Sequence, residues 1–318
     1  MSFVSSGVAP ATLIPGTVDI SVFPRTTSII NTTSGQIIQW VYISFQLDRL
    51  SSKGQLRHAG AFGWVARLRL ALFVRGVRDV TNVYHIVQFQ SGDAYAFFHG
   101  CHWKCSYCVR TLGLWDLGLP EDVRNELDKL WLQGRVKFLS IEEVVAILKE
   151  SGVRLAFFGG GEPTIDRELK PLIKRLKEEG IDVWLITNGE LLDEELVGMV
   201  RGITFSIKAL DDGLHRRITG RSNRTVLENF KRFVGSGKVV AETVYVKGLV
   251  ECDEVLRIAR FIASLNPETT FRIDPLVQNP PYEEVDSCIK EVMKILPRTY
   301  RIMATKGEPP NLLYPRIG

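Results

Sequence analysis

The chain has 318 residues, of which 45% are hydrophobic and 24% charged, and its net charge is +4 at neutral pH. This balance is typical of a globular protein of one large domain or two ordinary ones, and the small net charge does not indicate binding to nucleic acid or to an acidic membrane surface. The best candidate for a membrane span, residues 62–74, is interrupted by Arg67 and Arg69, and the N-terminus lacks the basic start and apolar core of a secretory signal. We therefore expect a cytoplasmic protein with no membrane or nucleic-acid partner.

Residues 1–80 differ in composition from the rest of the chain. They are rich in Ser, Thr, Gly and Ile, and the only charged residues among the first 50 are Asp19, Arg25, Asp48 and Arg49. No clear helical period and no catalytic constellation is visible in them. We expect an N-terminal extension of uncertain structure: a poorly ordered segment, a small β-rich appendage, or a start assigned upstream of the real one. A core domain is expected over residues 81–318.

From about residue 80, short apolar runs alternate with longer amphipathic ones. In chain order, we expect a strand at 94–98, helices at 121–132 and 141–150, a strand at 153–158, a helix at 166–179, a strand at 183–187, a helix at 193–200, a strand at 203–207, a helix at 225–234, a strand at 239–246, a helix at 253–265, a strand at 270–273, a helix at 282–295 and a last short strand at 300–303. Ser140 followed by Glu143 predicts a capping box at the start of the second helix. This alternation predicts parallel strands joined by right-handed crossovers, as in a barrel or part-barrel.

The unusual residues of the chain follow the predicted strands. A cysteine-rich loop comes after the first strand, a Gly-Gly-Gly-Glu-Pro-Thr run at 159–164 after the second, and Thr-Asn-Gly at 187–189 after the third. Lys208 follows the fourth strand, and Arg272 and Asp274 lie at the end of the sixth. Because ligands of parallel α/β folds bind at the carboxyl ends of the strands, we expect these loops to converge on one mouth.

Three of the five cysteines, Cys101, Cys105 and Cys108, have the spacing C-x-x-x-C-x-x-C. Cysteine thiolate is the usual ligand of iron–sulphur clusters, and three protein ligands leave one metal position open for chemistry. The alternative is a structural zinc site closed by His99 or His102. The glycine-rich loop that ends in a carboxylate favours the cluster, because a structural zinc site has no need of it.

The motif Cys101-x-x-x-Cys105-x-Tyr107-Cys108 and the later run Gly160-Gly161-Glu162-Pro163-Thr164 resemble the two signatures of the radical S-adenosylmethionine (radical SAM) enzymes. The resemblance covers about residues 95–275. It implies an α/β fold, a partial (β/α)6-type TIM barrel of the radical SAM kind. It also implies that the three thiolates hold a [4Fe-4S] cluster whose fourth iron is chelated by S-adenosyl-L-methionine. Reductive cleavage of that cofactor would release a 5′-deoxyadenosyl radical, which abstracts a hydrogen atom from the substrate.

The same resemblance implies a cofactor-binding set. Gly160 and Gly161 would let the backbone approach the methionine part of the cofactor, and Glu162 would accept a hydrogen bond from its ammonium group. Lys208 would contact the cofactor's carboxylate, although a strand-end lysine that reaches solvent is the alternative. The set is completed by Tyr107 and by Thr187 and Asn188, the last two of which could equally be ordinary turn residues.

The stretch from Phe205 to Lys208, with Thr187-Asn188-Gly189 before it, is similar to the glycyl-radical activating enzymes, such as those of pyruvate formate-lyase. This implies an anaerobic oxidoreductase with an external one-electron donor of the ferredoxin or flavodoxin type and a glycyl-radical protein as substrate. Ile186 and Ser206 stand where many of these enzymes have Asp, and the segment from Arg272 lacks their histidine. A radical SAM enzyme acting on a small molecule or peptide, and a non-catalytic metal-binding or electron-transfer protein, remain alternatives.

The remaining cysteines, Cys252 and Cys288, stand singly on predicted helices with no partner at ligand spacing. We expect both to be free, small buried apolar side chains, and the chain to hold one cluster only.

Overall fold

The structure, a computed structural model, describes residues 79–276, 282–302 and 308–317. The predicted N-terminal extension lies outside these residues except for its last two positions. In the described part, no helix is long and apolar enough to cross a membrane.

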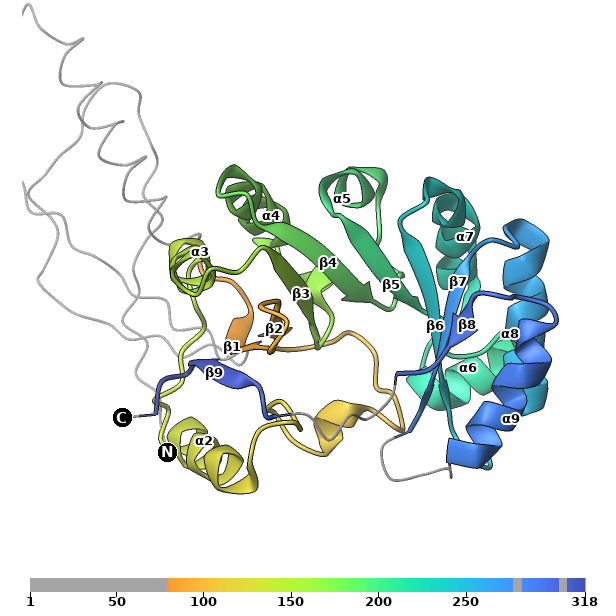
Figure 1. Ribbon diagram of the computed structural model, residues 1–318, viewed down its shortest axis with the longest axis horizontal. Helices are drawn as coiled ribbons and strands as arrows, with labels where there is room; N and C mark the ends of the chain where they lie inside the picture. Colours follow the sequence, from red (N-terminus) through yellow and green to blue (C-terminus); the bar gives the residue numbers. More distant parts are fainter. Residues whose placement is uncertain (1–78, 277–281, 303–307, 318) are drawn as a thin grey trace, which may run out of the picture. The chain divides into compact units, whose positions relative to one another are not determined.

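The described residues form one sheet of nine strands in the order β8-β7-β6-β5-β4-β3-β2-β1-β9 (Figure 1). The strands are β1 Val83–Gln88, β2 Ala94–Phe98, β3 Leu155–Gly160, β4 Asp182–Thr187, β5 Gly202–Ser206, β6 Val239–Tyr245, β7 Thr270–Pro275, β8 Thr299–Tyr300 and β9 Asn311–Tyr314. Neighbours from β2 to β8 pair in parallel, whereas β1 is antiparallel to both β2 and β9. The predicted α/β part-barrel is therefore confirmed, with β2–β7 as its six repeats.

The helices are α2 Glu121–Leu132, α3 Ile141–Glu150, α4 Leu169–Glu178, α5 Glu194–Met199, α6 Asp212–Thr219, α7 Arg224–Phe233, α8 Cys252–Leu265 and α9 Tyr282–Met293. The predicted capping box is present: Ser140 Oγ accepts from the Glu143 amide, and the Glu143 carboxylate accepts from the Ser140 amide. Helices such as α4, α5 and α7 lie along the outer face of the sheet (Figure 1). The main core lies between them and side chains such as Leu185 and Phe205.

A second apolar cluster lies at the β1 end of the sheet, where Tyr84, Phe97 and Trp115 pack with Leu127 and Leu130 of α2. It closes this side of the part-barrel. Because consecutive strand side chains point to opposite faces, β1 and β2 can contribute to both clusters.

Three elements were missing from the prediction. Strands β1 and β2 form a hairpin with Gly92 in its turn. The two apolar runs on either side of this turn could have predicted the hairpin from the sequence. The helix α6 is short and rich in charged residues, and it is capped by Asp211, whose carboxylate accepts from the Leu214 amide at 2.7 Å. The four-residue β9 owes its place to pairing with β1, more than 200 residues earlier in the chain.

The helix expected from residue 166 begins later, at Leu169. A 3-10 turn, η2 Pro163–Ile165, precedes it, and Asp166 is extended. The carboxylate of Asp166 accepts hydrogen bonds from the amides of Asn82 at 2.6 Å and Glu168 at 2.9 Å. Asp166 therefore fixes the approach to α4 and ties it to the start of β1.

The prediction that Cys252 and Cys288 are free is wrong. They form a disulfide between α8 and α9, with a Cα–Cα distance of 5.5 Å. Helix packing brings together two positions that the sequence does not connect. Disulfides are uncommon in reducing compartments, so the pair does not support the expected cytoplasmic location.

Candidate functional site

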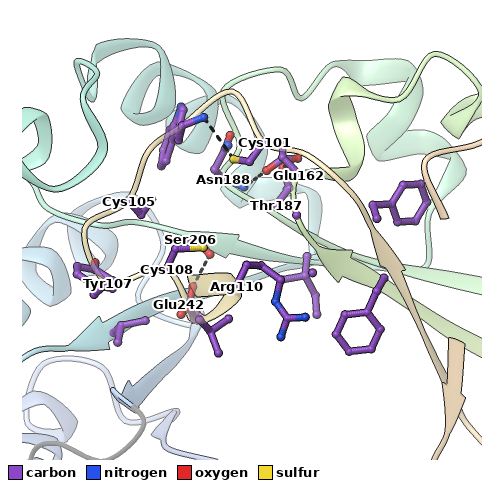
Figure 2. Close-up of a pocket in the computed structure, with 18 of the residues that line it drawn as sticks. Cys101, Cys105, Tyr107, Cys108, Arg110, Glu162, Thr187, Asn188, Ser206 and Glu242 are labelled. Carbon is purple, nitrogen blue, oxygen red and sulfur yellow. Dashed lines mark hydrogen bonds between the residues drawn. The ribbon is translucent and has the colours of Figure 1, made fainter. Parts of the chain in front are cut away.

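The carboxyl ends of the parallel strands open into a cavity of about 610 Å³ (Figure 2). All ten residues predicted for the site line it: Cys101, Cys105, Tyr107, Cys108, Gly160, Gly161, Glu162, Thr187, Asn188 and Lys208. Arg272 and Asp274 line it as well. The residues predicted from their positions after strands therefore lie together at one cavity.

The cysteine loop follows β2 and is held by the α6 end. The amides of Lys104 and Ser106 donate to the carbonyls of Thr219 at 3.1 Å and Ile218 at 2.8 Å. Cys101, Cys105 and Cys108 are free thiols. Burial raises the pKa of Cys101 to about 11, although the Trp103 amide, which donates to Cys101 Sγ at 3.3 Å, opposes the rise.

The two histidines considered for a zinc site contact side chains other than the three cysteines. His102 Nε2 lies 2.7 Å from Glu190 Oε2, and the His99 ring stacks on Trp131 with ring centroids 5.7 Å apart. Within residues 79–276, 282–302 and 308–317, no three side chains of His, Cys, Asp or Glu are grouped to hold a single metal ion.

The glycine loop runs against the cysteine loop. The amide of Gly161 donates to Phe98 O and the amide of Glu162 to Gly100 O, both at 2.8 Å. A Cβ atom at Gly161 would lie 2.1 Å from Gly100 O, and Gly160 has a φ of +88°. Glycine is required at these positions because the two backbones approach more closely than any side chain permits.

The Glu162 carboxylate joins the loops that follow β3 and β4. Its side chain is buried, and its carboxylate accepts from Thr187 Oγ1 at 2.7 Å, the Asn188 amide at 2.8 Å and Thr164 Oγ1 at 2.7 Å. Thr187 and Asn188 are therefore more than turn residues, since they fix this carboxylate. Asn188 Nδ2 is buried without a hydrogen-bond partner.

Lys208 points into the cavity and not into solvent. Its side chain is 14% exposed, and its Nζ lies 3.7 Å from Glu242 Oε2. Burial alone would lower the pKa of Lys208, but Glu242, Tyr107 and Cys105 together outweigh the burial, so the pKa lies above its usual value. Conversely, burial would raise the pKa of Glu242, but Lys208 and Arg272 hold it below the usual range. Both groups are therefore charged.

Sequence reasoning missed Glu242, which lies inside β6 and accepts a hydrogen bond from Ser206 Oγ. The sequence feature that could have identified it is a single carboxylate within a mostly apolar strand. Glu242 thus brings a carboxylate beside Ser206 from the neighbouring strand. Arg272 Nε lies 2.9 Å from Asp274 Oδ2, at an angle that does not suit a hydrogen bond.

Residues 95–262, more than half of the chain, match the radical SAM superfamily. Among curated proteins, the chain is 30% identical over 188 residues to a "Putative glycyl-radical enzyme activating enzyme" of Methanocaldococcus jannaschii, covering 57% of this chain and 66% of that protein. It is 32% identical over 180 residues to the GTP 3′,8-cyclase of Aquifex aeolicus, covering 54% and 52%. The chain thus spans about half to two thirds of the length of these relatives.

Solved structures with a similar fold include Streptococcus suis SuiB bound to S-adenosylmethionine, with 17% identity, a TM-score of 0.47, and coverage of 64% of this chain and 48% of that one. Another is a domain of pyruvate-formate lyase-activating enzyme from Bacteroides vulgatus, with 20% identity, a TM-score of 0.42, and coverage of 46% and 98%. On the family match and the cavity that contains both signature motifs, this chain belongs to the radical SAM superfamily.

Proposed function

We propose that this protein uses a [4Fe-4S] cluster to cleave S-adenosyl-L-methionine reductively and to take a hydrogen atom from a glycine of a protein partner. The observation that carries the proposal is the convergence of the cysteine loop, the glycine loop and Lys208 on one cavity. The enzymes of this superfamily depend on an external electron donor, for which we propose a ferredoxin or flavodoxin. Residues 81–318 are proposed as the core domain.

The residues present fit the cluster. Cys101, Cys105 and Cys108 are free thiols on one loop at the cavity wall, and three ligands leave one iron open. Their binding to iron requires loss of the thiol protons, which burial disfavours at Cys101 until the metal supplies positive charge. The backbone N–H of Trp103 already points to one of the sulphurs.

The residues present also fit S-adenosyl-L-methionine. A cavity of about 610 Å³ is within the range that holds a ligand of this size. Two polar groups at its wall, Tyr107 Oη and Asn188 Nδ2, are buried and have no hydrogen-bond partner in the described part of the chain. Gly160 and Gly161 keep the adjoining wall free of side chains.

When bound, the cluster and S-adenosyl-L-methionine supply the one-electron cleavage that releases the 5′-deoxyadenosyl radical. The chain binds, orients and excludes water. Lys208 offers a positive charge for the cofactor's carboxylate, and Glu242 holds that lysine in place and in its charged form. The Glu162 carboxylate fixes the Thr187 and Asn188 loop and retains a lone pair on Oε2, which among the described residues accepts only from the Asn188 amide.

The relative named as an activating enzyme and the stretch ending at Lys208 support a glycyl-radical protein as substrate. A small-molecule substrate is the second candidate, because GTP 3′,8-cyclases match over a similar part of the chain. An oxygen-poor cytoplasmic setting belongs to the proposal, since a cluster with an open iron is easily oxidised.

The test is anaerobic reconstitution with iron and sulphide, reduction, addition of S-adenosyl-L-methionine and chromatography of 5′-deoxyadenosine, beside a Cys105→Ala variant. Product from the parent and none from the variant supports the radical chemistry. One tightly bound zinc, no iron and no product would refute it. To separate the substrate classes, the assay is repeated with a purified glycyl-radical protein or with GTP. A glycine radical on the added protein, detected by electron paramagnetic resonance, supports the activating function, whereas turnover with GTP alone refutes it.

A further inference from the structure

We propose that Glu190 is a positioning residue that holds the cysteine loop in the conformation that binds the cluster and couples this loop to the cofactor loop at 187–189. The inference rests on the proposed function, because it concerns how the chain presents its three thiols. It goes beyond the signature residues, because Glu190 lies outside both motifs and its partners His102 and Trp103 are variable positions between Cys101 and Cys105.

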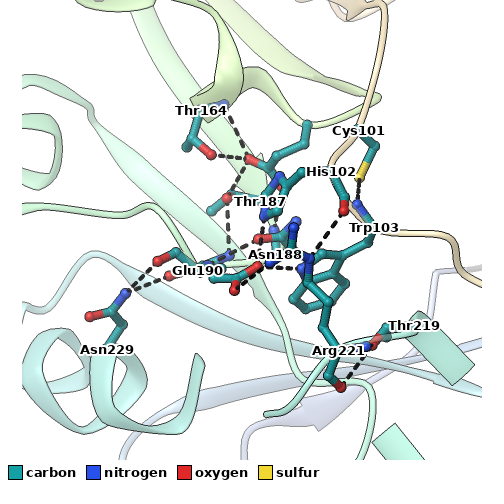
Figure 3. Close-up of polar contacts among 12 residues, drawn as sticks. Cys101, His102, Trp103, Thr164, Thr187, Asn188, Glu190, Thr219, Arg221 and Asn229 are labelled. Atoms are coloured by element: carbon teal, nitrogen blue, oxygen red, sulfur yellow. Dashed lines mark hydrogen bonds and ion pairs between the residues drawn. The ribbon is translucent and has the colours of Figure 1, made fainter. Parts of the chain in front are cut away.

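The Glu190 carboxylate contacts the cysteine loop directly (Figure 3). Its Oε2 accepts a hydrogen bond from Trp103 Nε1 at 2.5 Å and lies 2.7 Å from His102 Nε2. Its Oε1 lies 3.6 Å from Arg221 Nη1. The carboxylate is only 17% exposed, so these contacts are largely shielded from competing water.

These contacts bear on the first thiol of the motif. Glu190 holds the rings of the two residues that follow Cys101, and Arg221 Nε donates to the carbonyl of His102 at 3.2 Å. The backbone after Cys101 is thereby held by a side-chain carboxylate and by a guanidinium. This geometry presents the Trp103 amide to Cys101 Sγ, and hydrogen bonds to cluster sulphurs help to set the reduction potential.

Glu190 is itself fixed by its own loop and by helix α7. Its amide donates to Asn188 Oδ1 at 3.0 Å, and Asn229 Nδ2 donates to the carbonyls of Gly189 at 2.8 Å and Glu190 at 3.1 Å. The Asn188 amide in turn donates to Glu162. One residue therefore connects the loop that presents the thiols with the loop that lines the cofactor side of the cavity.

The effect should resemble that of other residues that orient metal ligands, whose loss typically weakens metal binding about 10–100-fold. Glu190→Ala removes the acceptor for both rings and leaves Trp103 Nε1 and Arg221 without it. Glu190→Gln keeps an oxygen that can accept from Trp103 but removes the negative charge. With less negative charge nearby, the cluster accepts an electron more readily, so its midpoint potential should rise.

The experiment compares the reconstituted parent, Glu190→Ala, Glu190→Gln and a matched control, Glu195→Ala. Glu195 is an exposed acid on α5 that pairs with Lys170. Iron and sulphide per chain, the rate of iron loss to a chelator, and the midpoint potential from a titration followed by electron paramagnetic resonance are measured. We expect iron loss about 10–100-fold faster in Glu190→Ala, an intermediate rate with a raised potential in Glu190→Gln, and parent values in Glu195→Ala.

Parent-like iron loss and potential in both Glu190 variants would overturn the inference while leaving the proposed function intact. A parent protein that takes up no iron would overturn both. If Glu190→Ala does not fold, Glu190→Gln is the deciding variant. An unchanged midpoint potential in Glu190→Gln would contradict the electrostatic effect of Glu190, and an unchanged rate of iron loss would contradict its positioning role.

Discussion

Gly161→Ala tests whether the close contact between the glycine and cysteine loops is required. The added Cβ would lie 2.1 Å from Gly100 O and 2.7 Å from Phe98 O, whereas ordinary contact begins at 3.4 Å, so the first atom pair must separate by 1.3 Å. Both obstacles are backbone oxygens, which cannot rotate away. Gly161 does not have a left-handed φ, so the cost is steric and not conformational.

The expected cost is the sum of two effects. Overpacking of a tight site costs about 1–3 kcal/mol. Separation of the loops also weakens the hydrogen bonds that Gly100 O and Phe98 O accept at 2.8 Å, and each such bond contributes about 1 kcal/mol. We therefore expect about 2–4 kcal/mol of lost stability. Because Gly100 precedes Cys101, iron binding should fall as well.

The assay is urea unfolding of the iron-free protein, with iron content measured after reconstitution. Gly113→Ala is the matched control: it lies in the chain just after the cysteine loop, has no atom within 4 Å of the added Cβ, and does not have a left-handed φ. Its stability should be unchanged or raised by up to about 1 kcal/mol. Unchanged stability and full iron content in Gly161→Ala would refute the reasoning.

Two further predictions concern the scaffold. Burial holds the pKa of His85 at about 4 against 6.5 in the unfolded chain, so stability present above pH 6.5 should fall as the pH drops toward 4, by about 3 kcal/mol for about 2.5 pKa units. Urea unfolding from pH 7 to pH 4 should show this loss in the parent and a smaller one in His85→Gln; equal slopes would contradict it. The Cys252–Cys288 disulfide closes a segment with a sequence separation of 36, so its loss in a double Ser variant should cost about 4 kcal/mol, and reductant should lower the unfolding midpoint of the parent but not of that variant.

Much of the fold was predictable because its signals are local. Strand β2 and helix α2 begin and end at the predicted residues, and Ser140 caps α3 as its spacing with Glu143 predicts. A strand was predicted at 239–246, and β6 forms there. A helix boundary differs from the prediction where a side chain has a distant partner. Asp166 accepts from the Asn82 amide and stays outside α4, which begins at Leu169.

The sequence by itself determined which residues could carry the chemistry. The cysteine spacing, the glycines before Glu162 and the position of each motif after a strand are one-dimensional facts, and parallel connectivity is enough to place strand ends at one edge of a sheet. Only the tertiary structure decided the partners of these residues. Glu242 reaches Lys208 from strand β6, and Glu190 contacts Trp103 at a sequence separation of 87. The pairing of Cys252 with Cys288 and of β9 with β1 is of the same kind, because such contacts depend on how separate elements pack and leave no periodic trace in the chain.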